Sequence, residues 1–339
     1  MAESAPHLEI LVPDLLPALT AAASPTARGV AAVLARADFS SAHWPGLETA
    51  LLDACGIAWQ GDASPPLAAA AARLDLDGLP SGAVMLRADP VHLRADPTRL
   101  VLFDAASLDV TAAEADTLIA DLNAHFAADG ITLRRGPVPH RWYLAWPAAP
   151  AVPSASPRSL RGVPLEPDQA MRRGLGELRR VLTEMQMVLH DSTANHARLA
   201  AGKPPVNSVW PWGWGELPAP HRTVPTALVG SDGELDVVAA HVGAQHDPDP
   251  ARLDAVLAAT AGDVVVVFAV HAAAGAATDW PAVFEIAVAA LRGGRVAGLT
   301  VATAHGRFVL TRGAARRWWR RPASFLARWQ ALLAAAETP

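Results

Sequence analysis

The chain has 339 residues, of which 51% are hydrophobic, with a formal net charge of −5 and a single cysteine, Cys55. This length predicts one large domain or two intertwined ones with a sizeable core. One cysteine excludes an internal disulfide and is typical of a reducing compartment. The negative charge argues against a surface coated with nucleic acid, and no apolar run is long enough to span a bilayer. Because the first residues also lack the basic region of a signal peptide, we expect a cytoplasmic protein.

Short apolar runs alternate with helical patterns in the N-terminal half. Strands are expected at 8–12, 84–88, 100–104 and 141–146. Thr111 and Glu114 have the spacing of a capping box, which predicts a helix that begins after Thr111. Apolar residues then follow at helical spacing: Leu118, Ile119, Leu122 and Phe126.

A stretch rich in Pro, Ser and Ala at 147–167 predicts a surface connection between two lobes. A second helical stripe follows it. Its members are Leu175, Leu178, Leu182, Met185 and Leu189.

The C-terminal half repeats the alternation of apolar segments and helical patterns. The apolar segments are TALVG, DVVAAHV, DVVVVFAVHA at 263–272, GLTVAT and RFVLTRG, with helices expected at 250–261 and near 280–292. DVVVVFAVHA is apolar on both faces, as central parallel strands are, and the last two segments predict a hairpin or an edge pair. Strand–helix alternation at both ends of the chain predicts an α/β fold with a mostly parallel sheet.

Ligands bind beyond the carboxyl ends of the strands in such sheets. Asp14, directly after the first strand, and His271, near the end of DVVVVFAVHA, are therefore the first candidates for a site. The alternative for Asp14 is a helix cap or a turn residue, and the alternative for His271 is a hydrogen-bonded core histidine.

The stretch PPVNSVWPWGWG, residues 204–215, places Trp210, Trp212 and Trp214 beside Gly213 and Gly215. Tryptophans concentrated in this way predict core packing. The glycines predict a close approach of the backbone to a ligand or to another segment.

Several residues of 84–146 and 190–218 form an ordered pattern. They are Arg87, Asp104, the helix from Thr111, His140–Arg141, Asn195, Arg198, Gly202, Asn207, Gly213 and Gly215. In order and spacing, these two stretches resemble the archaeal-type, cofactor-independent phosphoglycerate mutases of the alkaline phosphatase superfamily, in a divergent bacterial branch. The match covers about a third of the chain.

The resemblance implies an alkaline-phosphatase-like core at 1–80 and 165–339, with helices on both faces of its sheet. It also implies a smaller inserted α+β lobe at 81–150, and 147–167 would connect the two.

Members of that family use two divalent metals, manganese or zinc, and a transiently phosphorylated serine. Two cations clamp the attacking and leaving oxygens of a phosphoryl group, which takes about six carboxylate and imidazole ligands. Here Asp14 is followed by Leu15 rather than by glycine, and the stretch after the strongest strand has no acidic residue before Asp279. The late Asp–His pair of the family is Ala304–His305. We therefore expect no two-metal site and no other cofactor; an active enzyme would need two Mn or Zn ions.

Arg87 and Arg141 match positions at which the family's lobe presents guanidinium groups to a phosphorylated substrate, a role that suits a planar fork of donors. The alternative is a structural ion pair with Asp89, Asp96 or Asp104. We expect the two arginines to meet near Asp14 and Asn207, with a phosphate-like ligand or carboxylates between them. The candidate ligand-binding residues are Arg87, Arg141, Asp14, Asn207, Asn195, Arg198 and His271.

The sequence therefore predicts a degenerate phosphoglycerate-mutase-like protein that binds a phosphorylated small molecule or a protein partner in a regulatory role. One alternative is an active mutase or phosphatase with a rebuilt metal site. Another is an adaptor that binds nucleic acid or a membrane through RRWWRRPASFLARW, residues 316–329. For that segment we favour a terminal helix docked by its tryptophans, with its arginines in water. The sequence leaves a homo-oligomer open.

Overall fold

The computed structural model describes residues 5–13, 15, 19, 25–41, 44, 46–59, 65–79, 84–96, 99–147, 149–151, 154–160, 164–165, 176–268, 280–317, 327 and 329. The chain divides into two compact units, residues 1–59 with 218–339 and residues 60–217.

The second unit is larger than the lobe expected at 81–150. Residues 60–80 and 165–217, expected in the core, belong to it. Residues 165–217 belong to this unit because buried side chains of the helix at Gly176–Asp191 pack in the same hydrophobic cluster as those of the lobe's strands. The stretch 147–167 also lies within this unit rather than between two lobes. There Ser154 and Ser156 are buried, and the Ala155 carbonyl accepts a hydrogen bond from Trp210.

The first unit holds a sheet of seven strands in the order β10-β9-β11-β1-β12-β13-β2. Its strands are β1 (His7–Leu11), β2 (Asp38–Ser41), β9 (Ala227–Val229), β10 (Gln245–Asp247), β11 (Val264–Val267), β12 (Gly298–Thr303) and β13 (Gly306–Thr311). The strands from β10 to β12 pair in parallel, whereas β13 pairs antiparallel with β12 and with β2. The predictions of a mostly parallel sheet, of a central strand within 263–272 and of a final hairpin are confirmed.

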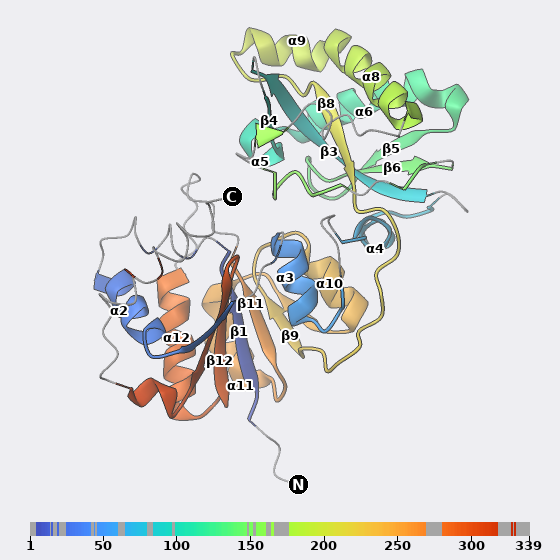
Figure 1. The fold of residues 1–339 in the computed structure, drawn as a ribbon. Coiled ribbons are helices and arrows are strands. Elements are labelled where there is room, and N and C mark those ends of the chain that lie inside the picture. The colour runs from blue at the N-terminus through green and yellow to red at the C-terminus, as the bar shows by residue number, and fades with distance from the viewer. Residues whose placement is uncertain are drawn as a thin grey trace. The chain divides into compact units, whose positions relative to one another are not determined.

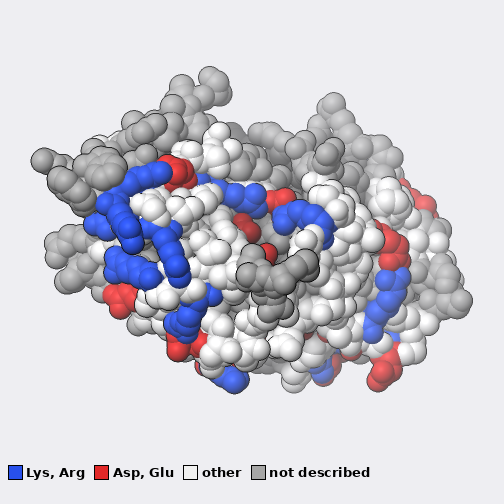
Figure 2. All heavy atoms as spheres, turned by 90° about the horizontal axis from the view of Figure 1, so that it is seen from below, with Lys and Arg blue, Asp and Glu red and all other residues white. Residues whose placement is uncertain are grey.

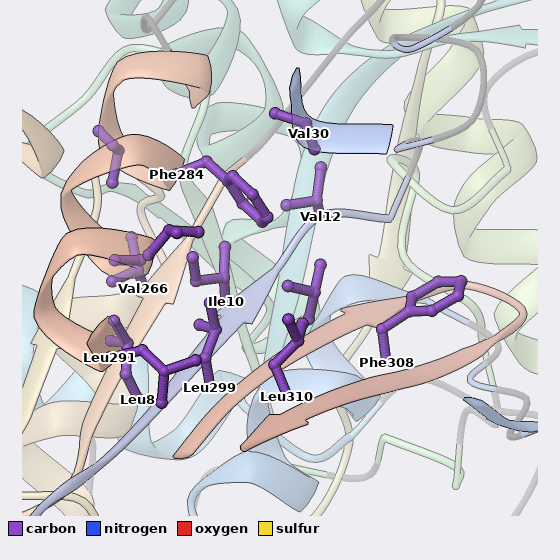
Figure 3. Packing of buried hydrophobic residues seen from close by; sticks show 14 of the residues in the cluster. Leu8, Ile10, Val12, Val30, Val266, Phe284, Leu291, Leu299, Phe308 and Leu310 are labelled. Carbon is purple, nitrogen blue, oxygen red and sulfur yellow. The ribbon is translucent and has the colours of Figure 1, made fainter. Parts of the chain in front are cut away.

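Helices cover both faces of this sheet, with α2 and α12 on one side and α3 and α10 on the other (Figure 1). The helices are α2 (Pro25–Leu34), α3 (Leu47–Ala54), α10 (Leu235–Val242), α11 (Leu253–Ala259) and α12 (Trp280–Gly293), with 3-10 turns η2 (Pro250–Arg252) and η3 (Ala314–Arg316). The apolar segment DVVAAHV lies in α10 and is therefore helical rather than a strand. Successive strand side chains point to opposite faces, so Leu8 and Ile10 pack with Val266, Phe284 and Leu291 on the α12 side (Figure 3).

The second unit is built on antiparallel strands. They are β3 (Val84–Ala95), β4 (Leu100–Phe103), β5 (Thr132–Arg135), β6 (Trp142–Trp146), β7 (Pro164–Leu165) and β8 (Ser208–Trp212). The order is β5-β6-β3-β4-β7, and β8 pairs with β3. Every pairing is antiparallel, so this unit has the α+β character expected of the lobe.

The helices of the second unit are α4 (Ala68–Asp75), α5 (Ala105–Leu108), α6 (Ala112–Phe126), α8 (Gly176–Asp191) and α9 (Thr193–Ala200), with the 3-10 turn η1 (Ala127–Asp129). The predicted capping box begins α6: the Thr111 hydroxyl accepts from the Glu114 amide, and the Glu114 carboxylate accepts from the Thr111 amide. The apolar stripes of α6 and α8 pack on one face of the sheet.

The tryptophan-rich stretch at 204–215 forms β8 and the turn after it. Trp210 and Trp212 are buried, and Trp214 is exposed. Gly213 and Gly215 have φ of +75° and +108°, and a side chain on either would press against Ala68 or Pro66. The predicted close approach is thus to another segment of the chain.

The C-terminal segment is described at Trp329, whose ring packs 4.6 Å from that of Phe308 and is buried. This contact agrees with a segment docked by an aromatic side chain. Among the described residues, no helix has both the length and the apolar character needed to cross a membrane.

Candidate functional site

Arg87 lies on the face of the second sheet opposite α6 and α8. Because side chains alternate along β3, Leu86 and Ala88 join the helix-side core while Arg87 and Asp89 point the other way. In register beside Arg87 are Tyr143 of β6 and Trp212 of β8. The guanidinium carbon lies 5.6 Å from the Tyr143 ring centroid and 5.0 Å from that of Trp212, so aromatic rings flank the cation.

The carboxylate of Asp89 holds this guanidinium. Arg87 Nη2 lies 2.8 Å from Asp89 Oδ1, and Arg87 Nε donates to the same oxygen at 3.1 Å. The indole of Trp212 donates to Asp89 Oδ2 at 2.8 Å. Both charged side chains are buried, and a buried ion pair is tolerated when further hydrogen bonds satisfy its oxygens, as they do here.

Arg141 lies directly before β6 and binds Asp75, the last residue of α4. Arg141 Nη1 is 2.8 Å from Asp75 Oδ2, and the Tyr143 hydroxyl donates to that oxygen at 2.5 Å. Burial raises the pKa of the Tyr143 phenol, so the hydroxyl keeps its proton at neutral pH. Arg87 and Arg141 thus meet around Tyr143. The carboxylates paired with them are Asp89 and Asp75.

His140 is the exposed member of this group. Loss of hydration beside the cluster lowers the pKa of its imidazole; Asp89 raises it, and Arg87 and Arg141 lower it further. His140 is therefore neutral at pH 7 and can gain a proton when an anion approaches. His140 belongs to the His140–Arg141 pair that carries the family resemblance. Its exposed position beside the buried charges could not be inferred from the sequence. We call Arg87, Asp89, Asp75, Arg141, Tyr143, Trp212 and His140 the arginine–aspartate cluster.

Asp104 has a different role. Its carboxylate accepts hydrogen bonds from the amide and the hydroxyl of Ser107, at 3.3 and 2.9 Å, and begins α5. These bonds make Asp104 a helix cap.

Asn195 and Arg198 join elements of the second unit. Asn195 donates to the carbonyls of Leu189 and Val206 and accepts from the Val206 amide. Arg198 donates to the carbonyls of Pro204 and Leu108 and lies 3.0 Å from the Glu114 carboxylate. Both side chains are buried, and these bonds hold α9 against the start of α6 and against the loop before β8.

Asn207 binds the backbone of β3 and is not near the two arginines. Its amide contacts the Leu93 N–H and carbonyl, at 2.8 and 2.9 Å. Leu93 lies six residues beyond Arg87 on the same strand, which at the rise of a β-strand is about 20 Å. The expectation that Asn207 joins the arginine pair is wrong. Asp14 and His271 lie outside the described residues.

A second charged group lies in the first unit and was not predicted. Arg307 of β13 is 3.2 Å from the Glu9 carboxylate of β1, contacts Asp53 of α3 and lies 4.9 Å over the Trp44 ring. Burial raises the pKa of Glu9, and Arg307 lowers it in part. The run LEILV predicts the interior of a strand. Its sequence gives no sign that the carboxylate of Glu9 faces an arginine almost 300 residues later in the chain.

Cys55 is buried beside this group, and burial raises the pKa of its thiol to about 12. Cys55 is therefore a small core residue and not a nucleophile. No group of three or more His, Cys, Asp or Glu side chains within the described part of the chain is arranged to hold a metal ion.

Comparisons with known proteins show the fold. The chain is similar to the PH0037 protein of Pyrococcus horikoshii, with a TM-score of 0.52 and 13% identity over 92% of this chain and 88% of that one. It is also similar to a cofactor-independent phosphoglycerate mutase of Thermoplasma acidophilum, with a TM-score of 0.39 and 15% identity over 91% and 90% of the two chains.

No family model and no curated protein match the chain. At 13% identity the first likeness shows a shared α/β fold alone, and a TM-score of 0.39 carries no argument. Function is therefore argued from the site.

Proposed function

We propose that this protein is a degenerate relative of the cofactor-independent phosphoglycerate mutases that binds a phosphorylated small molecule without turning it over, in a regulatory role in the cytoplasm. The observation that carries the proposal is the arginine–aspartate cluster. Its two arginines come from the strands that the family resemblance assigns to phosphate recognition, and they meet around one tyrosine.

The charges of the cluster suggest how an anion would bind. Arg87 and Arg141 are balanced by Asp89 and Asp75, so the buried part has no net charge. His140 is the exposed group, and its pKa is lowered in the free protein. A bound phosphate would favour the imidazolium form, which gives a charge-assisted hydrogen bond. Affinity should therefore rise as the pH falls from 8 toward the free imidazole pKa.

The two metals of the family do not fit the residues present here. The chemistry calls for about six carboxylate and imidazole ligands. The chain instead has Leu15 after Asp14, no acidic residue between His271 and Asp279, and Ala304 before His305. We therefore derive no catalytic step through metals, and an active mutase or phosphatase remains the second candidate.

Calorimetric titration with phosphoglycerate tests the proposal. His140→Gln should weaken binding about tenfold near pH 6.5, since a hydrogen bond to a charged group contributes about 1.5 kcal/mol. The matched control is His190→Gln, which removes another exposed histidine of the same unit. Equal affinities of the His140 variant and the parent, or no binding by the parent, would refute the assignment of this site.

A further inference from the structure

The last residue of α4 fills part of the arginine–aspartate cluster. Many charged side chains of this protein lie at the surface, where Asp and Glu (red) lie beside Lys and Arg (blue) in Figure 2. The side chains of Asp75 and Arg141 are instead only 4% and 5% exposed. Asp75 Oδ2 accepts from Arg141 Nη1 at 2.8 Å and from the Tyr143 hydroxyl at 2.5 Å. Because such donors also bind a phosphate oxygen, this carboxylate occupies the position that a phosphate would need.

The two carboxylates of the cluster are held in different ways. Asp89 lies two residues from Arg87 on β3, which pairs with both β6 and β8. The Trp212 indole also donates to Asp89. Asp75 comes from a separate helix, 66 residues before Arg141. The strand that carries both partners keeps Asp89 beside its arginine, whereas no strand holds Asp75 in place.

The last turn of α4 has few apolar contacts. Its residues Arg73 and Leu74 are exposed. The helix packs against β3 through residues with one methyl group each, whose burial contributes little stability. These buried residues are Ala68, Ala69, Ala71 and Ala72. Leu67 and Leu76, buried at the two ends of the helix, can keep α4 on the sheet while the Asp75 side chain turns out to solvent.

A glycine leaves room for the carboxylate. A Cβ at Gly136 would lie 3.1 Å from Asp75 Oδ2 and 3.1 Å from Tyr143 Cε2, closer than ordinary van der Waals contact. The Gly136 amide donates to the Arg141 carbonyl at 2.7 Å and closes the loop that carries His140. Departure of Asp75 would therefore open a space beside this loop, with the donors of Arg141 and Tyr143 facing it.

We propose that the Asp75 carboxylate inhibits the cluster from within, and that a phosphorylated ligand binds by displacing it from Arg141 and Tyr143. This inference rests on the function proposed above and names the regulation of that site. The exchange replaces one anion with another, so only an anion of higher charge than a carboxylate gains by it. A phosphate monoester is such an anion, because it is largely dianionic at pH 7. The apparent affinity falls with the fraction of the protein in which the site is open.

The test follows the displacement at Tyr143, which is the one tyrosine of the chain. Tyrosine labelled with carbon-13 at Cζ gives a single signal during titration of the full chain with phosphoglycerate at pH 7, and calorimetry measures the affinity. Asp75→Asn keeps the size of the side chain without its charge and should bind about tenfold more tightly than the parent. The control, Asp116→Asn, removes the carboxylate that pairs with Arg135 outside the cluster and should stay within about twofold.

The position of the signal separates the outcomes. At saturation the Tyr143 signal of the parent should reach that of saturated Asp75→Asn, because phosphate is then the acceptor in both proteins. A parent that binds while its signal stays in place would overturn the inference and leave the proposed function intact, as would an Asp75→Asn variant that binds no more tightly. Absence of binding by both proteins would refute the proposed function, and the inference with it. If Asp75→Asn does not fold, movement of the parent's signal decides.

Discussion

Removing the Asp89 carboxylate tests whether Arg87 depends on its own strand for a partner. In Asp89→Ala, the buried guanidinium loses the carboxylate that contacts its Nε and Nη2, and the Trp212 indole loses its acceptor. Breaking a buried ion pair from one side costs about 3–5 kcal/mol, because a charge stays behind without its counter-charge. We expect a loss of that size in the free energy of unfolding of the second unit.

Urea unfolding followed by tryptophan fluorescence measures this loss. The double variant Arg87→Met/Asp89→Leu removes both charges and keeps apolar volume, so it should be destabilised by about 2 kcal/mol less than Asp89→Ala. A cost below about 1 kcal/mol for Asp89→Ala, or a double variant as unstable as the single one, would refute the paired geometry.

Three further predictions concern the first unit. The Cys55 thiol, with its pKa raised to about 12 by burial, should not react with a thiol reagent at pH 8 until the protein is unfolded; prompt reaction of the native protein would contradict this. Burial raises the pKa of Glu9 above its unfolded value, so its ionised form costs stability at neutral pH and that cost disappears as the pH falls through the folded pKa. Thermal midpoints of Glu9→Gln and the parent should therefore converge on acidification, and a constant difference between pH 4 and 8 would disprove the assignment. Gly294 has φ of +81°, a left-handed conformation that L side chains rarely adopt, so Gly294→Ala should cost about 1 kcal/mol even after the Arg312 guanidinium moves aside. Gly293→Ala, with open space around it, should be neutral or stabilising, and equal effects of the two variants on urea unfolding would contradict the left-handed backbone at Gly294.

Local patterns predicted the parts of the fold that depend on neighbouring residues. The capping box at Thr111 and Glu114 is present because its two bonds lie within four residues. The run at 263–272 contains a central strand, β11, which pairs in parallel with a strand on each side. A strand whose side chains are all apolar is typical of a sheet covered by helices on both faces.

Pairings between distant residues could not be predicted in this way. Asp75 is 66 residues from Arg141, and its role depends on where α4 ends against β6. The expectation that Asn207 lies near the two arginines was wrong because the sequence analysis did not expect a strand at β8. The register of β8 with β3 places Asn207 beside Leu93. Asp89 was one of three carboxylates considered for Arg87, and alternation along β3 puts both on one face.

The most direct test of the central claim is to follow phosphoglycerate by phosphorus NMR in the presence of the full chain, first as purified and then with saturating manganese or zinc. We predict a bound signal that strengthens from pH 8 to pH 6.5, weakens in His140→Gln, and never gives a second phosphoglycerate isomer or free phosphate. Steady formation of either product by the parent would contradict the claim and establish the active enzyme instead.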